Sequence, residues 1–542
     1  MKERKFIFVV GGVLSGVGKG VTTASIGAIF KDKGFSVTAL KADPYINVDA
    51  GTMNPTEHGE VFVTDDKDET DQDMGNYERF LDVDLTSLNY MTTGRVYTSV
   101  IENERTMKYK GKCVQVVPHI PHEINRRIKA AAEKHDAEIT IIEIGGTVGE
   151  YENLLFLEAA RMLKLEKPDD VAFVLVSYLP VPNHIGEMKT KPTQHASRQL
   201  NGVGINADIL VARSSQPIDA PRKEKLAVFC GLAKERIIAA PDVSSIYEIP
   251  IKMEEQNISS LLLKSLHLEE RGSEIPTWVK MNEKINKADK EINIAVIGKY
   301  FGSGQYTLSD SYISVIEAIK HASWHQGLKP KLTWIDSGTY EEDKEKINEL
   351  AKFDGILVPG GFGTRGVEGI ISAIKYAREN KKPYLGICYG MQLATIEFIR
   401  NVVGKDKANT VEMDEYTSEP VININETQLK NVDGNRYGGT MRLGAYDATL
   451  KEGSRVRELY GQETISERHR HRYEFNNDYR ADLQDNGMNI VGINDETNLV
   501  EIIELDDHPY FVASQFHPEF KSRPMRPHPL FNGFISAIKD NK

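Results

Sequence analysis

The stretch from Lys5 to Ser25, KFIFVVGGVLSGVGKGVTTAS, constrains the fold more than any other part of the chain. Its apolar run, Phe6 to Val10, is rich in β-branched and aromatic residues, which is typical of a buried parallel strand. Five glycines with Lys19 follow, and then a helix-like pattern. A strand, a glycine-rich loop and a helix in this order can wrap a phosphate, because loop amides and the helix N-terminus point at the anion. Lys19 would bridge the oxygens of a triphosphate.

The loop departs from the standard nucleotide-binding pattern at two places. Gly20 follows Lys19 where that pattern has serine or threonine, and the first glycine comes one position early. We interpret the segment as a variant phosphate loop. The alternative is a glycine-rich turn between a strand and a helix that binds no ligand.

Length and composition indicate an enzyme of two or more domains. A chain of 542 residues is too long for one core. No long uncharged apolar run could span a bilayer, and the amino terminus runs directly into the first strand without a signal peptide. The three cysteines lack metal-ligand spacing, and the net charge of −12 argues against nucleic-acid binding. We expect a cytoplasmic protein with no membrane or nucleic-acid partner.

Strand-like and helix-like segments alternate in both halves, which predicts an α/β fold. We expect two domains, each a mainly parallel sheet with helices on both faces. The predicted boundaries are residues 1–268 for a phosphate-loop domain, 269–291 for a linker with a short polar helix, and 292–542 for a second domain. The predicted strands after the first are Ser36 to Lys41, Ala137 to Ile144, Val171 to Ser177, Ala207 to Ala212, Arg236 to Ala240, a strand opening at Ile292, Lys331 to Asp336, Gly355 to Pro359 and Tyr384 to Ile387.

Carboxylates gather in two places in the first half. The polar segment from Lys41 to Asp73 is too long to be a mere connection, and it ends in a run of aspartates. Glu143 lies at the carboxyl end of a predicted strand, the edge at which parallel sheets bind ligands. Charge runs are usually solvated surfaces, but a triphosphate needs magnesium, which takes one or two carboxylates.

The segment EMKTKPTQ mixes lysines with hydroxyl and amide side chains just after another predicted strand. Lys189, Lys191 and Thr193 suit a second polyphosphate. A solvated basic loop explains them equally well.

The second half contains a G-x-C-x-G motif, formed by Gly386, Cys388 and Gly390. Glycines on both sides allow a sharp turn from strand to helix that exposes the thiol and aims the next amide at an oxyanion. The alternative is a buried structural cysteine. His517 and Glu519 alternate in VASQFHPEF and can serve as base and orienting carboxylate. Gly360 and Gly361 follow a strand, where a second oxyanion donor is expected.

The motifs PGGFG, GICYGMQ and QFHPEF resemble those of class I glutamine amidotransferases. Together with GGVLSGVGKG, KADPYINVDAGTM, HGEVFVT, EIGGTVG, GEMKTKPTQH and GGTMRLGA, they make nearly the whole chain resemble the CTP synthase family. The resemblance implies ATP-dependent amination of UTP to CTP through a 4-phosphorylated UTP. It implies ammonia from L-glutamine, or free ammonia, as the nitrogen source, Mg²⁺ with ATP, CTP as feedback inhibitor and GTP as allosteric activator. It also implies a homotetramer, and it leaves filament formation open.

Site residues follow from the same resemblance, position by position. The catalytic residues it implies are Cys388, His517, Glu519 and Lys19. The ATP-binding residues it implies are Gly16, Val17, Gly18, Lys19, Gly20, Val21, Asp73, Asp242 and Val243, with Asp73 and Glu143 on magnesium. The UTP- and CTP-binding residues it implies are Ser15, Glu150, Tyr151, Glu152, Lys189, Thr190, Lys191, Pro192, Thr193, Gln194 and Lys225. The glutamine-binding residues it implies are Gly361, Tyr389, Gly390, Met391, Gln392, Glu412 and Arg472.

Three departures from the family pattern affect which residue roles the resemblance implies for this chain. Gly16 stands where some members have serine, Pro241 replaces a more usual lysine, and the segment around Asn431 to Tyr437 is short, which bears on activation by GTP. Two other functions share some of these features. A corrinoid amidase combines similar domains, but its carboxylate substrate does not explain KTKPTQ. A partition-type ATPase switch or a filament-forming protein has no use for Cys388, His517 and Glu519.

Overall fold

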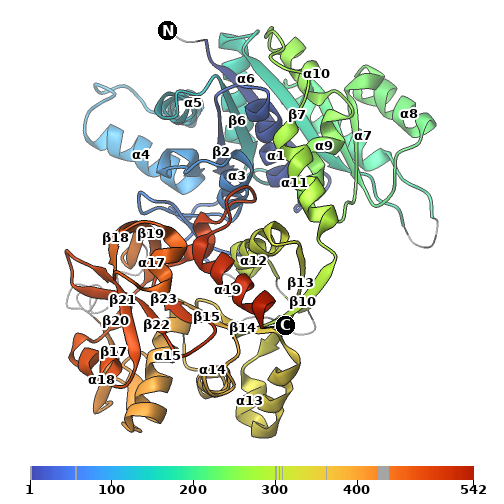
Figure 1. Ribbon diagram of the computed structural model, residues 1–542. Helices are drawn as coiled ribbons and strands as arrows, with labels where there is room; N and C mark the ends of the chain where they lie inside the picture. Colours follow the sequence, from blue (N-terminus) through green and yellow to red (C-terminus); the bar gives the residue numbers. More distant parts are fainter. Residues whose placement is uncertain are drawn as a thin grey trace. The chain divides into compact units, whose positions relative to one another are not determined.

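The computed structural model describes residues 3–54, 58–182, 184, 186–299, 302–303, 306–307, 309–361, 363–424 and 439–541. The chain forms two compact units, which confirms the expected two-part α/β architecture (Figure 1). The first unit comprises Met1–Asp49 and Asp73–Glu283, and the second comprises Ala50–Gln72 and Lys284–Lys542. The segment 50–72 therefore packs with the second unit, although it lies within the predicted first domain. The domain boundaries at 268 and 292 stay a prediction, and the helix α11 (Pro276–Lys287) covers much of the predicted linker.

The first unit is built on a sheet of seven strands, in the order β5-β2-β6-β1-β7-β8-β9. Every neighbouring pair in it is parallel, as the alternating pattern predicted. The strands are β1 (Lys5–Gly12), β2 (Val37–Asp43), β5 (Tyr90–Thr92), β6 (Ile139–Ile144), β7 (Val171–Tyr178), β8 (Ile209–Ser214) and β9 (Ile237–Pro241). The sequence analysis did not find β5, which is only three residues long.

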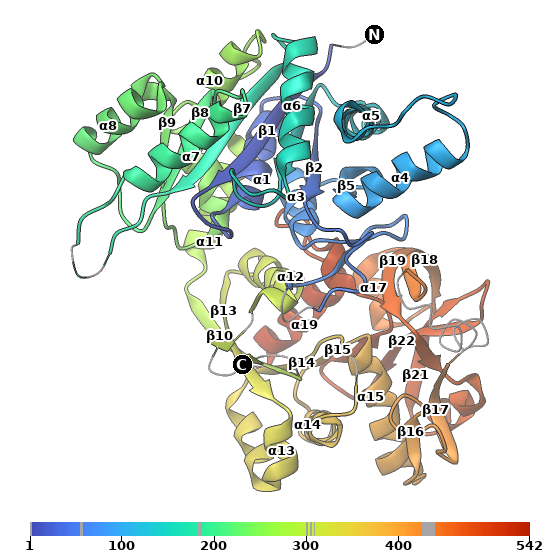
Figure 2. The same ribbon diagram turned by 180° about the vertical axis from the view of Figure 1, so that it is seen from behind.

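Helices cover both faces of this sheet (Figures 1 and 2). Phe6, Phe8 and Val10 of β1 join a core with α4 to α8, while Ile7 and Val9 point to the opposite face, where α1 packs. The helices are α1 (Lys19–Asp32), α3 (Asp73–Leu81), α4 (Thr93–Arg105), α5 (Val116–Lys134), α6 (Leu154–Glu166), α7 (Lys191–Gly202), α8 (Ala220–Cys230), α9 (Ile249–Glu254) and α10 (Ile258–Ser265). The phosphate loop thus joins a buried central strand to a packed helix.

The second unit has a sheet of nine strands, in the order β13-β10-β14-β15-β23-β22-β21-β18-β19. Its first five strands are parallel and the remaining four continue antiparallel, so this sheet is mixed. The strands are β10 (Lys290–Gly298), β13 (Leu328–Asp336), β14 (Gly355–Val358), β15 (Tyr384–Ile387), β18 (Arg442–Leu450), β19 (Thr464–His471), β21 (Met488–Asn494), β22 (Leu499–Leu505) and β23 (Phe511–Ser514).

Two cores fill the two faces of the second sheet. Alternate residues of β10 divide between them, with Ala295 and Ile297 beneath α14 and α15, and Ile294 and Val296 beneath α12 and α19. The helices are α12 (Ile313–His325), α13 (Gly338–Glu342), α14 (Val367–Glu379), α15 (Tyr389–Phe398), α17 (Arg455–Tyr460), α18 (Arg480–Gln484) and α19 (Pro529–Asp540). Short strands complete the unit, namely β16 (Ala408–Thr410), β17 (Glu419–Ile424) and β20 (Tyr473–Phe475) in one sheet and the pairs β3 (Phe62–Val63) with β4 (Glu69–Thr70) and β11 (Gly302–Ser303) with β12 (Tyr306–Thr307).

None of the helices that the structure describes combines the length and the apolar character needed to cross a membrane.

Candidate active sites

The phosphate loop connects the carboxyl end of β1 to the first residue of α1, Lys19. Gly18 caps the helix with a φ of 91°, a conformation that side chains with a Cβ rarely adopt. The Lys19 ammonium is buried and donates to the Gly146 carbonyl at 3.0 Å. Burial lowers the pKa of Lys19, and Glu143 partly offsets this effect. Among the described residues no carboxylate forms an ion pair with Lys19, and a buried cation of this kind is well suited to receive a polyanion.

The departure at Gly20 has a steric cause. A Cβ at position 20 would lie 2.0 Å from Oδ1 of Asp73, the first residue of α3. Serine or threonine, the residues of the standard loop, would therefore collide with this carboxylate. Glycine at this position lets Asp73 lie directly against the phosphate loop.

Lys41 joins the carboxylates predicted for magnesium. Its Nζ lies 2.5 Å from Asp73 Oδ2 and 2.8 Å from Glu143 Oε1, and Asp43 follows at 3.7 Å. Burial raises the pKa of Asp43 to about 6, and one of its oxygens has no hydrogen-bond partner among the described residues. Within the described residues no three side chains form a complete metal cage. Two carboxylates are nevertheless the donors that magnesium takes when phosphate oxygens supply the rest.

The residues predicted for the adenine side of ATP lie at the same sheet edge as the phosphate loop. Asp242 follows the last residue of β9, and its carboxylate lies 3.1 Å from the Arg213 guanidinium. A Cβ at Gly18 would meet the same Arg213 side chain at 3.5 Å. Arg213 therefore brings Asp242 close to the phosphate loop. Pro241, one of the departures from the family, is the final residue of β9.

The predicted pyrimidine-nucleotide residues also follow strand ends. Lys191 is exposed at the first position of α7, while Thr193 is buried and hydrogen-bonded to Ser177 at 2.8 Å. Lys189 is half-exposed beside Glu187, and Lys225 is exposed on α8. The turn after β6 carries Glu150, whose Oε2 accepts from the Thr147 amide at 2.9 Å, with Tyr151 and Glu152 exposed beside it. Apart from Lys225, which lies in the middle of α8, these cations and carboxylates lie in connections that follow the carboxyl ends of parallel strands.

Two carboxylates of the acidic segment before Asp73 pair with cations of the second unit. Asp65 pairs with Arg468 and with Lys521, the latter at 3.4 Å. Burial opposes ionisation of Asp65, but these two cations hold its pKa below the usual range. Glu69 pairs with Arg470 at 2.9 Å. Asp65 and Glu69 are therefore paired with cations of the second unit, while Asp66 is exposed.

Cys388 occupies a strained turn between β15 and α15. Its φ is 51° and its ψ is −97°, a conformation that is costly for a residue with a Cβ. Both flanking glycines are sterically required, because a Cβ at Gly386 would lie 2.7 Å from the Tyr384 hydroxyl and one at Gly390 would lie 2.4 Å from the Val358 carbonyl. This geometry is that of a nucleophile elbow.

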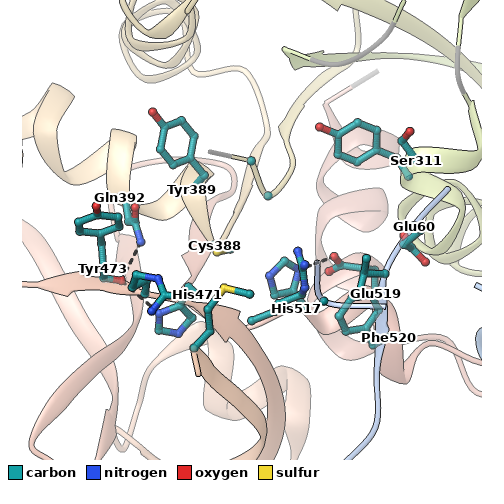
Figure 3. A pocket seen from close by; sticks show the side chains of 18 of the residues that line it. Glu60, Ser311, Cys388, Tyr389, Gln392, His471, Tyr473, His517, Glu519 and Phe520 are labelled. Carbon is teal, nitrogen blue, oxygen red and sulfur yellow. Dashed lines mark hydrogen bonds and ion pairs between the residues drawn. The ribbon is translucent and has the colours of Figure 1, made fainter. Parts of the chain in front are cut away.

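The base and its orienting carboxylate face the thiol (Figure 3). His517 Nδ1 lies 2.7 Å from Glu519 Oε1, and His517 Nε2 has no hydrogen-bond partner among the described residues. Burial disfavours the imidazolium, but the Glu519 carboxylate and the Cys388 sulfur outweigh burial and raise the pKa of His517 to about 10. The arrangement therefore favours a protonated histidine beside the sulfur.

Cys388 opens into a cavity of about 540 Å³ in the second unit. Five predicted glutamine-binding residues line it, namely Gly361, Tyr389, Gln392, Glu412 and Arg472. Gly390 and Met391 do not line it, because Gly390 packs against Val358 and Met391 is buried in the core. The lid segment from Asn431 to Tyr437 lies outside the described residues.

Much of this cavity wall was not predicted from the sequence. His471 and Tyr473 line it from the end of β19 and from β20, and Gly51, Met53, Glu60 and Val61 line it from the segment 50–72. Glu60 accepts hydrogen bonds from both the amide and the hydroxyl of Ser314, next to the start of α12. The alternation in RHRHRYE was a usable signal for the first group. No local pattern in the sequence indicated that the segment 50–72 lines this cavity.

Comparisons with known proteins agree with this geometry. A family model described as the CTP synthase N-terminus matches residues 5–268, and one for class I glutamine amidotransferases matches residues 307–537. The CTP synthase of Carboxydothermus hydrogenoformans is 50% identical over 541 residues, covering 99% of both chains. Those of Thermococcus gammatolerans and Methanocaldococcus jannaschii are each 48% identical, covering at least 99% of both chains. The chain therefore belongs to the CTP synthase family.

Proposed function

We propose that this chain converts UTP to CTP, with the first unit activating UTP at the expense of ATP and the second unit releasing ammonia from glutamine. The strained Cys388 beside the His517–Glu519 pair carries the proposal, because a nucleophile, a base and an orienting carboxylate meet in one cavity. Neither the comparisons nor the site favours a corrinoid amidase.

In the second unit Cys388 attacks the glutamine amide carbon, and the carbonyl oxygen becomes an oxyanion. Tyr389 is the first residue of α15, so its amide and the helix N-terminus face the developing charge. His517 gives a proton to the departing ammonia and then takes one from the water that hydrolyses the thioester. Glu519 holds the imidazole in the required orientation throughout. Gln392, Glu412 and Arg472 bind the rest of the glutamine.

In the first unit the oxygen at position 4 of uracil must become a better leaving group. ATP phosphorylates it, and the Lys19 ammonium stabilises the charge on the transferred phosphoryl group. Asp73 and Glu143 are the residues that would hold magnesium, which supplies positive charge to the triphosphate. Lys41 lies between these two carboxylates, and its charge favours the ionised form of each, although burial still raises the pKa of Glu143.

The nucleotide contacts follow the sheet edge. Gly16 to Val21 with Asp242 and Val243 hold ATP, while Ser15, Lys189 to Gln194 and Lys225 hold the triphosphate of UTP or CTP. Glu150 to Glu152 recognise the CTP base in feedback inhibition. We further propose activation by GTP and assembly into a homotetramer. The direct test is CTP formation, followed by its absorbance, from UTP, ATP, magnesium and glutamine; no CTP in that mixture would refute the proposal.

Replacing Gly20 by alanine is expected to lower ammonia-dependent CTP formation by about 10- to 100-fold, since overpacking costs about 1–3 kcal/mol and displaces Asp73. The measurement is the steady-state rate with ammonium chloride as nitrogen source. Gly202→Ala is the matched control, because Gly202 is exposed and a Cβ there meets nothing within 4 Å. A Gly20→Ala rate equal to wild type would refute the steric reason given for this glycine.

Replacing Glu152 by alanine is expected to weaken CTP inhibition several-fold while changing the KM for UTP little. The reason is that the two nucleotides share a triphosphate site but place their bases differently. The measurement is the inhibition constant for CTP and the KM for UTP, both determined on one preparation. Equal changes in both would place Glu152 in the shared part of the site.

A further inference from the structure

Lys299 is a buried cation beside the glutaminase cavity for which the reaction above has no role. It follows β10 directly, and 8% of it is exposed. Its ammonium donates to the Tyr389 hydroxyl at 3.0 Å and to the Gly363 carbonyl, and it lies 4.3 Å from the centre of the Tyr389 ring. Burying a lysine costs free energy unless its ammonium is paired or hydrogen-bonded. Here the partners of the ammonium are Gly363 and Tyr389.

Gly363 is held from both sides of its backbone. Its amide donates to Glu412 Oε1 at 2.8 Å, while its carbonyl accepts from Lys299 and, at 3.0 Å, from the Tyr389 hydroxyl. Its φ of 84° sets the direction of the chain at this point. Three side chains from three separate segments thus fix one glycine.

Two glycines shortly before Gly363 lie beside the reacting atoms. A Cβ at Gly360 would lie 2.8 Å from His517 Cε1 and 3.7 Å from Cys388 Cβ, so Gly360 lies close to both side chains. Gly361, two residues before the fixed Gly363, lines the cavity. An oxyanion donor must be placed to within a few tenths of an ångström to be effective.

The surroundings of Lys299 leave its ammonium charged near neutral pH. Burial lowers the pKa of Lys299 to about 8, although the Glu412 and Glu341 carboxylates oppose the change. Burial raises the pKa of Glu412, while its hydrogen bond from Gly363 and the charge of Lys299 act in the other direction. The charges of Lys299 and Glu412 therefore stabilise each other from the two sides of the Gly363 peptide.

We propose that Lys299 is a positioning residue that holds Gly363, so that the amide of Gly361, two residues earlier, can stabilise the oxyanion formed when Cys388 attacks the glutamine amide. This inference rests on the proposed glutaminase reaction and adds to it a residue that does not touch the substrate.

The test is Lys299→Met, which keeps the length of the side chain and removes its donors. We expect the kcat for glutamine hydrolysis to fall about 10- to 100-fold with little change in KM, because the oxyanion exists only during reaction. Alkylation of Cys388 by iodoacetamide should keep its wild-type rate, since this displacement forms no oxyanion. Lys299→Arg should restore part of the kcat.

Two controls separate this role from a general loss of structure. Lys352→Met removes a lysine that also lies over an aromatic ring, Phe353, but on the surface, and it should behave as wild type. Ammonia-dependent CTP formation by Lys299→Met should be unchanged.

Three results would overturn the role of Lys299, namely an unchanged kcat, a change in KM alone, or an equal loss of alkylation and hydrolysis. Absence of glutaminase activity in the wild-type protein would instead overturn the proposed function.

Discussion

Cys388→Ser is expected to abolish glutamine hydrolysis and glutamine-dependent CTP formation, by about 10³-fold or more, because the triad acts as a unit. Serine keeps the shape of the side chain, but its hydroxyl proton is far harder to remove than that of a thiol. CTP formation from added ammonium at mildly alkaline pH should survive, since free ammonia is then available. Glutamate release and CTP formation are measured in parallel.

Cys113→Ser is the matched control for Cys388→Ser, because Cys113 is an exposed free cysteine in the first unit. It should retain both reactions. Glutaminase activity that persists in Cys388→Ser would remove Cys388 as the nucleophile. Loss of the ammonia-dependent reaction would show that the two reactions are not chemically separable.

Lys19→Ala is expected to abolish CTP formation from glutamine and from ammonia alike, because phosphorylation of UTP precedes both. The ammonium is the buried cation of the phosphate loop, and its loss removes charge stabilisation worth several kcal/mol in phosphoryl transfer, or about 10³-fold in rate. CTP formation is measured with each nitrogen source. Thermal unfolding, measured on the same preparation, should show a folded protein.

The control for Lys19→Ala is Lys252→Ala, which removes an exposed lysine of α9 that is paired with Glu255. It should leave both rates unchanged. Near-normal CTP formation by Lys19→Ala would mean that another group stabilises the phosphoryl transfer. Loss of the glutamine-dependent reaction alone would place Lys19 in the transfer of ammonia instead.

Several parts of the protein could be predicted from sequence because their signals are local. The glycine-rich loop after Phe6 to Val10 specified a strand, a loop and a helix in succession, and the structure has them as β1, the loop and α1. The spacing of Gly386, Cys388 and Gly390 predicted the sharp turn. The structure has this turn, and neither glycine has room for a Cβ. His517 and Glu519 are in contact as predicted, but the structure places Glu519 in a 3₁₀ helix, Pro518–Lys521, and not in the extended chain on which the prediction relied.

Other features depended on contacts between residues distant in sequence. Gly20 looked like a departure from a motif, and only the position of Asp73, 53 residues later in this numbering, explains it. The antiparallel half of the second sheet could not be predicted, since pairing direction is set by partner strands and not by the pattern of one strand. Lys299 carried no signal, because its partners come from three other segments.

The segment 50–72 shows this difference most clearly. Its sequence determined that it is long, polar and rich in carboxylates, and both a surface and a magnesium site agreed with that composition. Tertiary structure alone decided that Asp65 and Glu69 pair with Arg468 and Arg470 and that Glu60 faces the cavity of Cys388. The physical reason is that the charge of a carboxylate is fixed by its own chemistry, whereas its role depends on which cation the fold brings within about 4 Å.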